Sequence, residues 1–227
     1  MRLAPHRPGR RGTEAGVEGR GIAGIDHDRP PQTPEEALQA LLDGNRRYVS
    51  GETRSVDYGR LGDRIAESQA PFAAIVTCAD SRLSVPVIFD LGLGNVLVSR
   101  VAGNSVDAGT LGSTEYAVAE LGVRLVLILG HSNCGAVKAA LAVAEGRASF
   151  PRERFGGIGA LVDAIVEPVK ALPEQSRTLE QAIVANASAQ AARMAAAEPI
   201  VRPAIDAGRL LVVAAVYDIG SGRVSVI

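Results

Sequence analysis

The stretch Leu125-Val-Leu-Ile-Leu-Gly-His-Ser-Asn-Cys134 joins a continuous apolar run to two side chains that commonly bind metals. An unbroken aliphatic run is typical of a strand that is buried on both faces, as in a parallel sheet covered by helices. A second apolar run, Phe72–Thr77, leads in the same way into Cys78-Ala-Asp-Ser-Arg82. The sequence therefore predicts two strands that are each followed by candidate metal ligands.

Apolar runs and helical segments alternate along the rest of the chain. Further strands are predicted at Val96–Val101 and Leu210–Tyr217, and a turn at Gly220-Ser-Gly222 predicts an antiparallel edge strand at Val224–Ile227. The predicted fold class is α/β, with a mostly parallel central sheet flanked by helices and an antiparallel edge strand at the C-terminus. The helices are predicted at Thr110–Leu121, Cys134–Glu145, Ile158–Leu172 and Leu179–Ala197.

An N-terminal helix is predicted to start the folded part of the chain. Thr33 can cap it, Pro34 suits its first turn and Glu36 completes a capping box. This helix packs either across the rest of the domain or onto a second subunit, and the sequence does not choose between them. Residues 1–32 are rich in Arg, Gly and Pro, so we expect a disordered tail there and a single domain over residues 33–227.

Composition excludes several classes of partner. The 227 residues are 47% hydrophobic and carry a formal net charge of -1, which suits a substantial core and argues against binding to nucleic acid. Acidic residues also dilute the positive charge of residues 1–32, which disfavours a nucleic-acid-binding arm there. No apolar stretch approaches the roughly 20 residues of a membrane-spanning helix, and residues 1–32 do not resemble a secretory signal. We expect a cytoplasmic protein without a membrane partner.

The two cysteines of the chain, Cys78 and Cys134, are the next constraint. They could be two buried thiols or one disulfide. The neighbouring Asp80, Arg82 and His131 instead favour a metal site, because two thiolates and one imidazole suit tetrahedral Zn²⁺ and leave a fourth position for water or substrate. Ligands of open parallel sheets bind beyond the carboxyl ends of strands, where both candidate motifs begin.

Several segments together make the chain, from about Thr33 to its end, similar to the β-class carbonic anhydrases. Each segment alone is only moderately informative, but their shared order and spacing make the resemblance specific. In chain order they are Cys78-Ala-Asp-Ser-Arg82, Arg100-Val-Ala-Gly-Asn104, Gly112-Ser-Thr-Glu-Tyr-Ala-Val118, Gly130-His-Ser-Asn-Cys-Gly-Ala-Val137 and Ala215-Val-Tyr-Asp218.

The resemblance implies a zinc-dependent catalytic domain that hydrates CO₂ reversibly to bicarbonate and a proton. Zn²⁺ would be held by Cys78, His131 and Cys134, with hydroxide at the fourth position attacking CO₂. Asp80 resembles the gating carboxylate of the family, which Arg82 holds away from the metal and aims at the bound water. In the closed, inactive state of the family, this carboxylate ligates zinc itself.

Two further residues match substrate-binding positions of the family. Gln69 corresponds to a glutamine that hydrogen-bonds substrate, often from the partner subunit, and Tyr116 corresponds to an aromatic lining residue. Their structural alternatives are a cap at the strand entry for Gln69 and helix core for Tyr116. The family assembles as dimers or multiples of dimers, so a homo-oligomer is implied.

Two other functions remain open from the sequence. Related proteins with the same ligands hydrolyse CS₂ or COS, which are linear molecules that hydroxide attacks in the same way as CO₂. A noncatalytic module that binds zinc or bicarbonate is the second alternative, and Asp80, Arg82 and Gln69 argue against it.

Overall fold

The computed structural model describes residues 30–54, 66–151 and 157–227. Residues 1–29 of the expected N-terminal tail lie outside these ranges. None of the helices in the described part of the chain is both long and apolar enough to cross a membrane.

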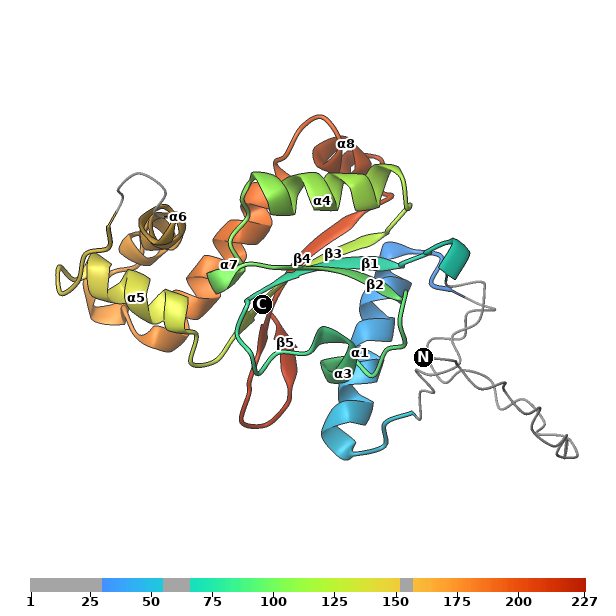
Figure 1. Ribbon diagram of the computed structural model, residues 1–227, viewed down its shortest axis with the longest axis horizontal. Coiled ribbons are helices and arrows are strands. Elements are labelled where there is room, and N and C mark those ends of the chain that lie inside the picture. Colours follow the sequence, from blue (N-terminus) through green and yellow to red (C-terminus); the bar gives the residue numbers. More distant parts are fainter. Residues whose placement is uncertain (1–29, 55–65, 152–156) are drawn as a thin grey trace, which may run out of the picture.

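Five strands of the described chain form one central sheet in the order β2-β1-β3-β4-β5 (Figure 1). The first four strands run parallel, and β5 pairs antiparallel with β4. The predicted α/β fold class and its C-terminal antiparallel edge are confirmed. The strands are β1 Ala73–Thr77, β2 Val96–Arg100, β3 Leu125–His131, β4 Leu211–Tyr217 and β5 Val224–Val226.

Helices cover both faces of this sheet (Figure 1). The predicted helices correspond to α1 Pro34–Ser50, α4 Ala108–Ala119, α5 Gly135–Ala144, α6 Ile158–Lys170 and α7 Leu179–Ala195. Within residues 30–54, 66–151 and 157–227, four further short helices were not predicted, because each offers fewer than two turns of pattern. They are α3 Val85–Ile88, α8 Val201–Asp206 and the 3₁₀ helices Ala102–Asn104 and Glu174–Ser176.

The apolar runs are continuous because β1 and β3 are buried along their whole length. Successive side chains of a strand point to opposite faces. Ile75 and Leu127 belong to the core beneath α1, α5 and α6, whereas Val76 and Ile128 belong to the core beneath α4 and α8. Both faces of these central strands therefore exclude water.

Helix α1 packs on its own chain, the first of the two arrangements that the sequence left open. The Asn45 side chain donates to Ile88 O and Gly222 O and accepts from Val224 N, at 2.8 to 3.1 Å. The predicted cap is present, since Thr33 Oγ1 accepts from Glu36 N at 3.1 Å. The capping box differs in one detail.

In that box the Glu36 carboxylate accepts from Gln32 N at 2.7 Å, one residue before the expected donor. The side chains of Thr33 and Glu36 therefore still accept hydrogen bonds from backbone N–H groups at the start of α1. The predicted start of the helix is confirmed.

Candidate metal centre

The candidate ligands lie where the sheet reverses its direction of winding. From β1 the chain crosses over to β2 at one side, whereas from β3 it crosses to β4 at the other. Such a switch point leaves a crevice at the carboxyl ends of the two central strands. Thr77 pairs with Leu129 in the β1–β3 register, so Cys78 and His131 come next to each other at this edge.

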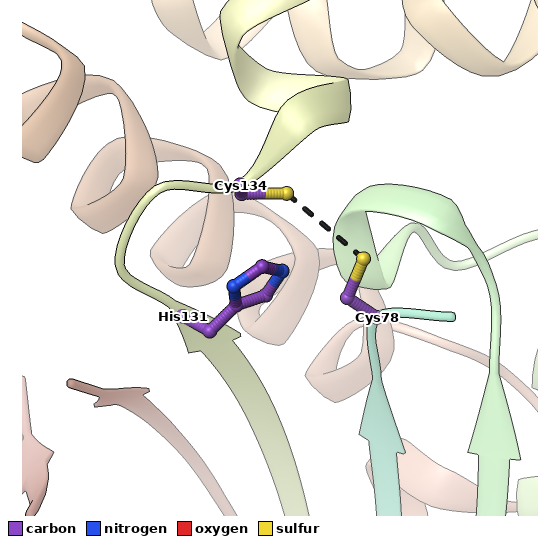
Figure 2. Close-up of side chains that lie close together, drawn as sticks. All are labelled: Cys78, His131 and Cys134. Atoms are coloured by element: carbon purple, nitrogen blue, oxygen red, sulfur yellow. Dashed lines mark hydrogen bonds between the residues drawn. The ribbon is translucent and has the colours of Figure 1, made fainter. Parts of the chain in front are cut away.

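The three side chains converge on one point (Figure 2). Cys78 follows β1, His131 ends β3, and Cys134 is the N-cap of α5. The two Sγ atoms are 4.0 Å apart, and one ligand atom from each residue lies within 4.8 Å of the others. Both cysteines are free thiols, so the alternative of a disulfide is not found.

His131 presents one ring nitrogen to this cluster. Its Nδ1 lies 2.9 Å from Ser132 O, and because a carbonyl oxygen only accepts, Nδ1 donates its proton there. The other nitrogen, Nε2, then carries a lone pair, is buried and has no hydrogen-bond partner among the described residues. A buried polar atom without a partner is rare, and a metal ion is the ligand that would satisfy this one.

One hydrogen bond, with its proton between the two sulfurs, joins Cys78 and Cys134. This bond, with His131 and the Gly103 N–H beside it, lowers the pKa of Cys78 to about 4 despite its burial. The same hydrogen bond, and then burial, raise the pKa of Cys134. A divalent cation between the sulfurs would displace this proton and bind both as thiolates, so the donor set fits a metal.

Asp80 lies at the edge of the cluster and is held by Arg82. Arg82 Nε donates to Asp80 Oδ1 at 2.9 Å and Nη2 donates to Oδ2 at 2.7 Å, while the Arg82 backbone N–H donates to Oδ1 at 3.0 Å. These bonds keep the pKa of Asp80 well below its usual range. Asp80 Oδ2 is 3.9 Å from His131 Nε2, too far for a hydrogen bond.

Arg100 braces the same loop from β2, a contact that the sequence analysis did not anticipate. Its Nε donates to Cys78 O at 3.2 Å and its Nη2 to Asp80 O at 2.5 Å. Arg100 stands at the carboxyl end of a predicted strand, and this position could have indicated that its side chain lies close to the site.

Gln69 and Tyr116 are not part of the cluster within one chain. Gln69 is exposed ahead of β1. Tyr116 is 49% exposed on α4, so the alternative of helix core is wrong. It lines an open hollow beside β2 with Leu97 and Val98, and none of the three candidate ligands lines that hollow.

Comparisons with known proteins agree on one family. Residues 73–224, well over half of the chain, match the family model described as carbonic anhydrase. The chain belongs to the β-carbonic anhydrase family. Carbonic anhydrase of Pseudomonas aeruginosa is 32% identical over 193 residues, which are 82% of this chain and 86% of that protein. Carbonic anhydrase 2 of Mycobacterium tuberculosis is 49% identical over 117 residues.

Solved structures of β-carbonic anhydrases share the fold. The Coccomyxa enzyme in complex with acetazolamide has a TM-score of 0.62 at 28% identity, covering 84% of this chain and 86% of that one. A tetrameric β-carbonic anhydrase of Sordaria macrospora has a TM-score of 0.61 at 26% identity, covering 84% and 96%. The match to the M. tuberculosis protein covers 50% of this chain and 55% of that protein, so the chain spans about half the length of that relative.

Proposed function

We propose that this protein is a zinc-dependent carbonic anhydrase that reversibly hydrates CO₂ to bicarbonate and a proton. The observation that carries the proposal is the buried cluster of Cys78, His131 and Cys134, whose ligand atoms lie within 4.8 Å of one another. Membership of the β-carbonic anhydrase family supports the same reaction. The zinc-dependent domain would comprise residues 33–227.

Zinc suits the donor set, because two sulfurs and one imidazole nitrogen are ligands it commonly takes. Three protein ligands leave one tetrahedral position open, as in catalytic rather than structural zinc sites. When bound, Zn²⁺ lowers the pKa of water and so supplies a nucleophile close to neutral pH.

Asp80 is the proposed hydrogen-bond acceptor of the site. Its Oδ2 atom lies 3.9 Å from His131 Nε2, so Asp80 borders the cluster without occupying it. The ion pair with Arg82 keeps Asp80 ionised and able to accept a hydrogen bond from water or from the hydroxyl of bicarbonate. If the pair broke, Asp80 could turn to the metal and close the site.

Gln69 is proposed to contact substrate from a partner subunit in a homo-oligomer, and Tyr116 is proposed to line the substrate site. The exposure of both side chains and the hollow beside the β2 edge support these roles. The tetrameric relative from Sordaria macrospora supports a multiple of dimers. Sedimentation velocity would test the assembly, and a monomer at micromolar concentration would contradict it.

We also propose a cytoplasmic location. Two free cysteines that must stay reduced to bind metal suit a reducing compartment.

Stopped-flow CO₂ hydration by the zinc-loaded chain at alkaline pH, beside an assay of COS turnover, tests the proposed reaction. We expect rapid hydration of CO₂ and little turnover of COS. COS turnover without CO₂ hydration would identify a related hydrolase. Full zinc content without either activity would identify a noncatalytic zinc-binding module, and either result would overturn the proposal.

A further inference from the structure

The segment between β2 and α4 contacts a proposed zinc ligand through its backbone. Gly103 lies in the 3₁₀ helix Ala102–Asn104, and its N–H donates to Cys78 Sγ at 3.3 Å. A hydrogen bond to a ligating sulfur withdraws charge from it and fixes its direction, and such outer contacts tune metal sites. The orientation of the Ala102–Gly103 peptide group, which carries this N–H, therefore acts directly on Cys78.

Gly103 needs a left-handed backbone conformation and a close fit to make this contact. Its φ is +69°, in the left-handed region that favours glycine. A Cβ atom there would lie 2.3 Å from Ile165 Cδ1 and 3.1 Å from Ala136 Cβ, so α6 and α5 close over it. These apolar contacts confine the residue, but only hydrogen bonds can orient its peptide groups.

Two amide side chains of α7 supply those hydrogen bonds at both ends of residues 103–106. Asn186 Nδ2 donates to Gly103 O at 2.8 Å, and Gln190 Oε1 accepts from Val106 N at 2.8 Å. Gln190 Nε2 also donates to Asn186 Oδ1 at 3.2 Å, which fixes the direction that the Asn186 amide faces. The two residues are four apart on a helix and so lie on the same face.

The side-chain amides of Asn186 and Gln190 are buried. Asn186 is 0% exposed and Gln190 is 3% exposed, on a helix face that otherwise buries Ala, Ile and Met. Burying an amide is unfavourable unless its hydrogen bonds are made, and aliphatic side chains would fill the same space without that requirement. Both oxygens and both nitrogens here have partners, including Ala164 O for Gln190 Nε2 at 3.2 Å.

We propose that Asn186 is a positioning residue for the zinc site. It holds the Gly103 carbonyl and so fixes the backbone torsions at Gly103, across whose Cα the N–H donates to Cys78 Sγ, and Gln190 holds Asn186 in that orientation. The inference rests on the proposed zinc function, since it concerns one of the ligands of that metal. It adds a contact from α7, an element that contributes none of the proposed ligands, to the control of zinc binding.

Zinc affinity, measured on the full-length chain by competition with a chromophoric chelator, tests the inference. Asn186→Leu keeps the size of the side chain and removes the donor to Gly103 O. We expect zinc to bind about tenfold more weakly, at the lower end of the roughly 10–100-fold effect of outer contacts.

Asn45→Leu is the matched control. Asn45 is another buried asparagine whose side chain makes hydrogen bonds to the backbone. Its backbone partners are Ile88, Gly222 and Val224, and none of them makes a hydrogen bond to the cluster. We expect this variant to keep wild-type zinc affinity even where it loses stability to a similar degree.

A second readout follows the hydrogen bond itself. In protein loaded with an NMR-active cadmium isotope, we expect a scalar coupling between the metal and the Gly103 amide proton, transmitted through Cys78 Sγ. The coupling should be lost or reduced in Asn186→Leu and kept in Asn45→Leu.

Equal zinc affinity in the two leucine variants, with the coupling intact in both, would overturn the inference. If Asn186→Leu does not fold, Asn186→Asp keeps the shape and removes the donor, and wild-type zinc affinity in that variant overturns the inference equally. Absence of the coupling in the wild-type chain overturns it without any variant. A wild-type chain that binds no zinc would instead contradict the proposed function.

Discussion

Arg82 holds the carboxylate of Asp80 through two of its side-chain nitrogens, at 2.9 Å from Nε to Oδ1 and 2.7 Å from Nη2 to Oδ2. Arg82 is half exposed, and solvent screens an exposed ion pair, so this pair adds little to stability. Its value to the protein is therefore in the direction that it gives to Asp80, which lies beside the proposed metal ligands.

Asp80→Asn should keep its zinc and lose most of its activity. An uncharged amide cannot keep the ion pair with Arg82 that orients this acceptor, so we expect kcat for CO₂ hydration to fall about 100-fold, as for loss of one oriented hydrogen-bonding group. Stopped-flow kinetics and metal analysis on the same sample measure both. Asp206→Asn, which breaks the exposed ion pair with Arg202, is the control and should keep full kcat. Loss of zinc from Asp80→Asn would contradict the assigned role.

Cys134→Ser should lose zinc itself. A serine hydroxyl does not ionise near neutral pH and cannot replace a thiolate, so we expect zinc affinity to fall by more than the roughly 100-fold that loss of an outer contact produces. Metal content after dialysis against a chelator measures the change, with Asp80→Asn as the control that retains zinc. A full complement of zinc in the serine variant would show that Cys134 is no ligand.

Gly103→Ala should destabilise the fold more than Gly122→Ala. Both glycines have positive φ, at +69° and +66°, and alanine in that region costs about 1–2 kcal/mol. Only at Gly103 would the new Cβ also meet Ile165, at 2.3 Å, which adds about 1–3 kcal/mol of overpacking. Urea unfolding of the two variants measures the difference, and equal losses would mean that the space around Gly103 is not as tight as described.

Asp218 should make the stability of the chain depend on pH below about 4. Hydrogen bonds from the Ser221 hydroxyl and backbone N–H, and from the Ser132 hydroxyl, lower the pKa of Asp218 from 3.8 to about 2. Because the folded pKa is the lower one, its stabilisation is fully present above pH 3.8 and is lost as the pH falls toward 2.

Wild type and Asp218→Asn should accordingly differ more in their free energy of unfolding at pH 5.5 than at pH 3. Urea unfolding at the two pH values measures this. A difference that stays constant, or grows toward pH 3, would contradict the sign of the pKa shift.

The sequence predicted the sheet well because the signals for its strands are local. Leu125–Leu129 and the run before Cys78 are continuous apolar segments, and their lengths and order required crossover helices. The meeting of Cys78 with His131 was predictable for the same reason, since parallel strands carry their carboxyl ends to one edge.

Contacts between distant elements could not be predicted in this way. The packing of α1 on its own chain depends on Asn45, whose partners include Gly222 and Val224, far along the sequence. The exposure of Tyr116 depends on which face of α4 meets the sheet. Asn186 carried no signal, because an asparagine in an alanine-rich helix gives no hint that its amide faces the loop behind a cysteine.

X-ray absorption at the zinc edge of the purified chain tests the central claim most directly, because it counts the sulfur and nitrogen atoms around the metal. With Cys78, His131 and Cys134 as ligands, we predict two sulfur atoms at about 2.3 Å and one imidazole nitrogen at about 2.0–2.1 Å. A zinc ion surrounded only by oxygen and nitrogen would contradict the proposed site.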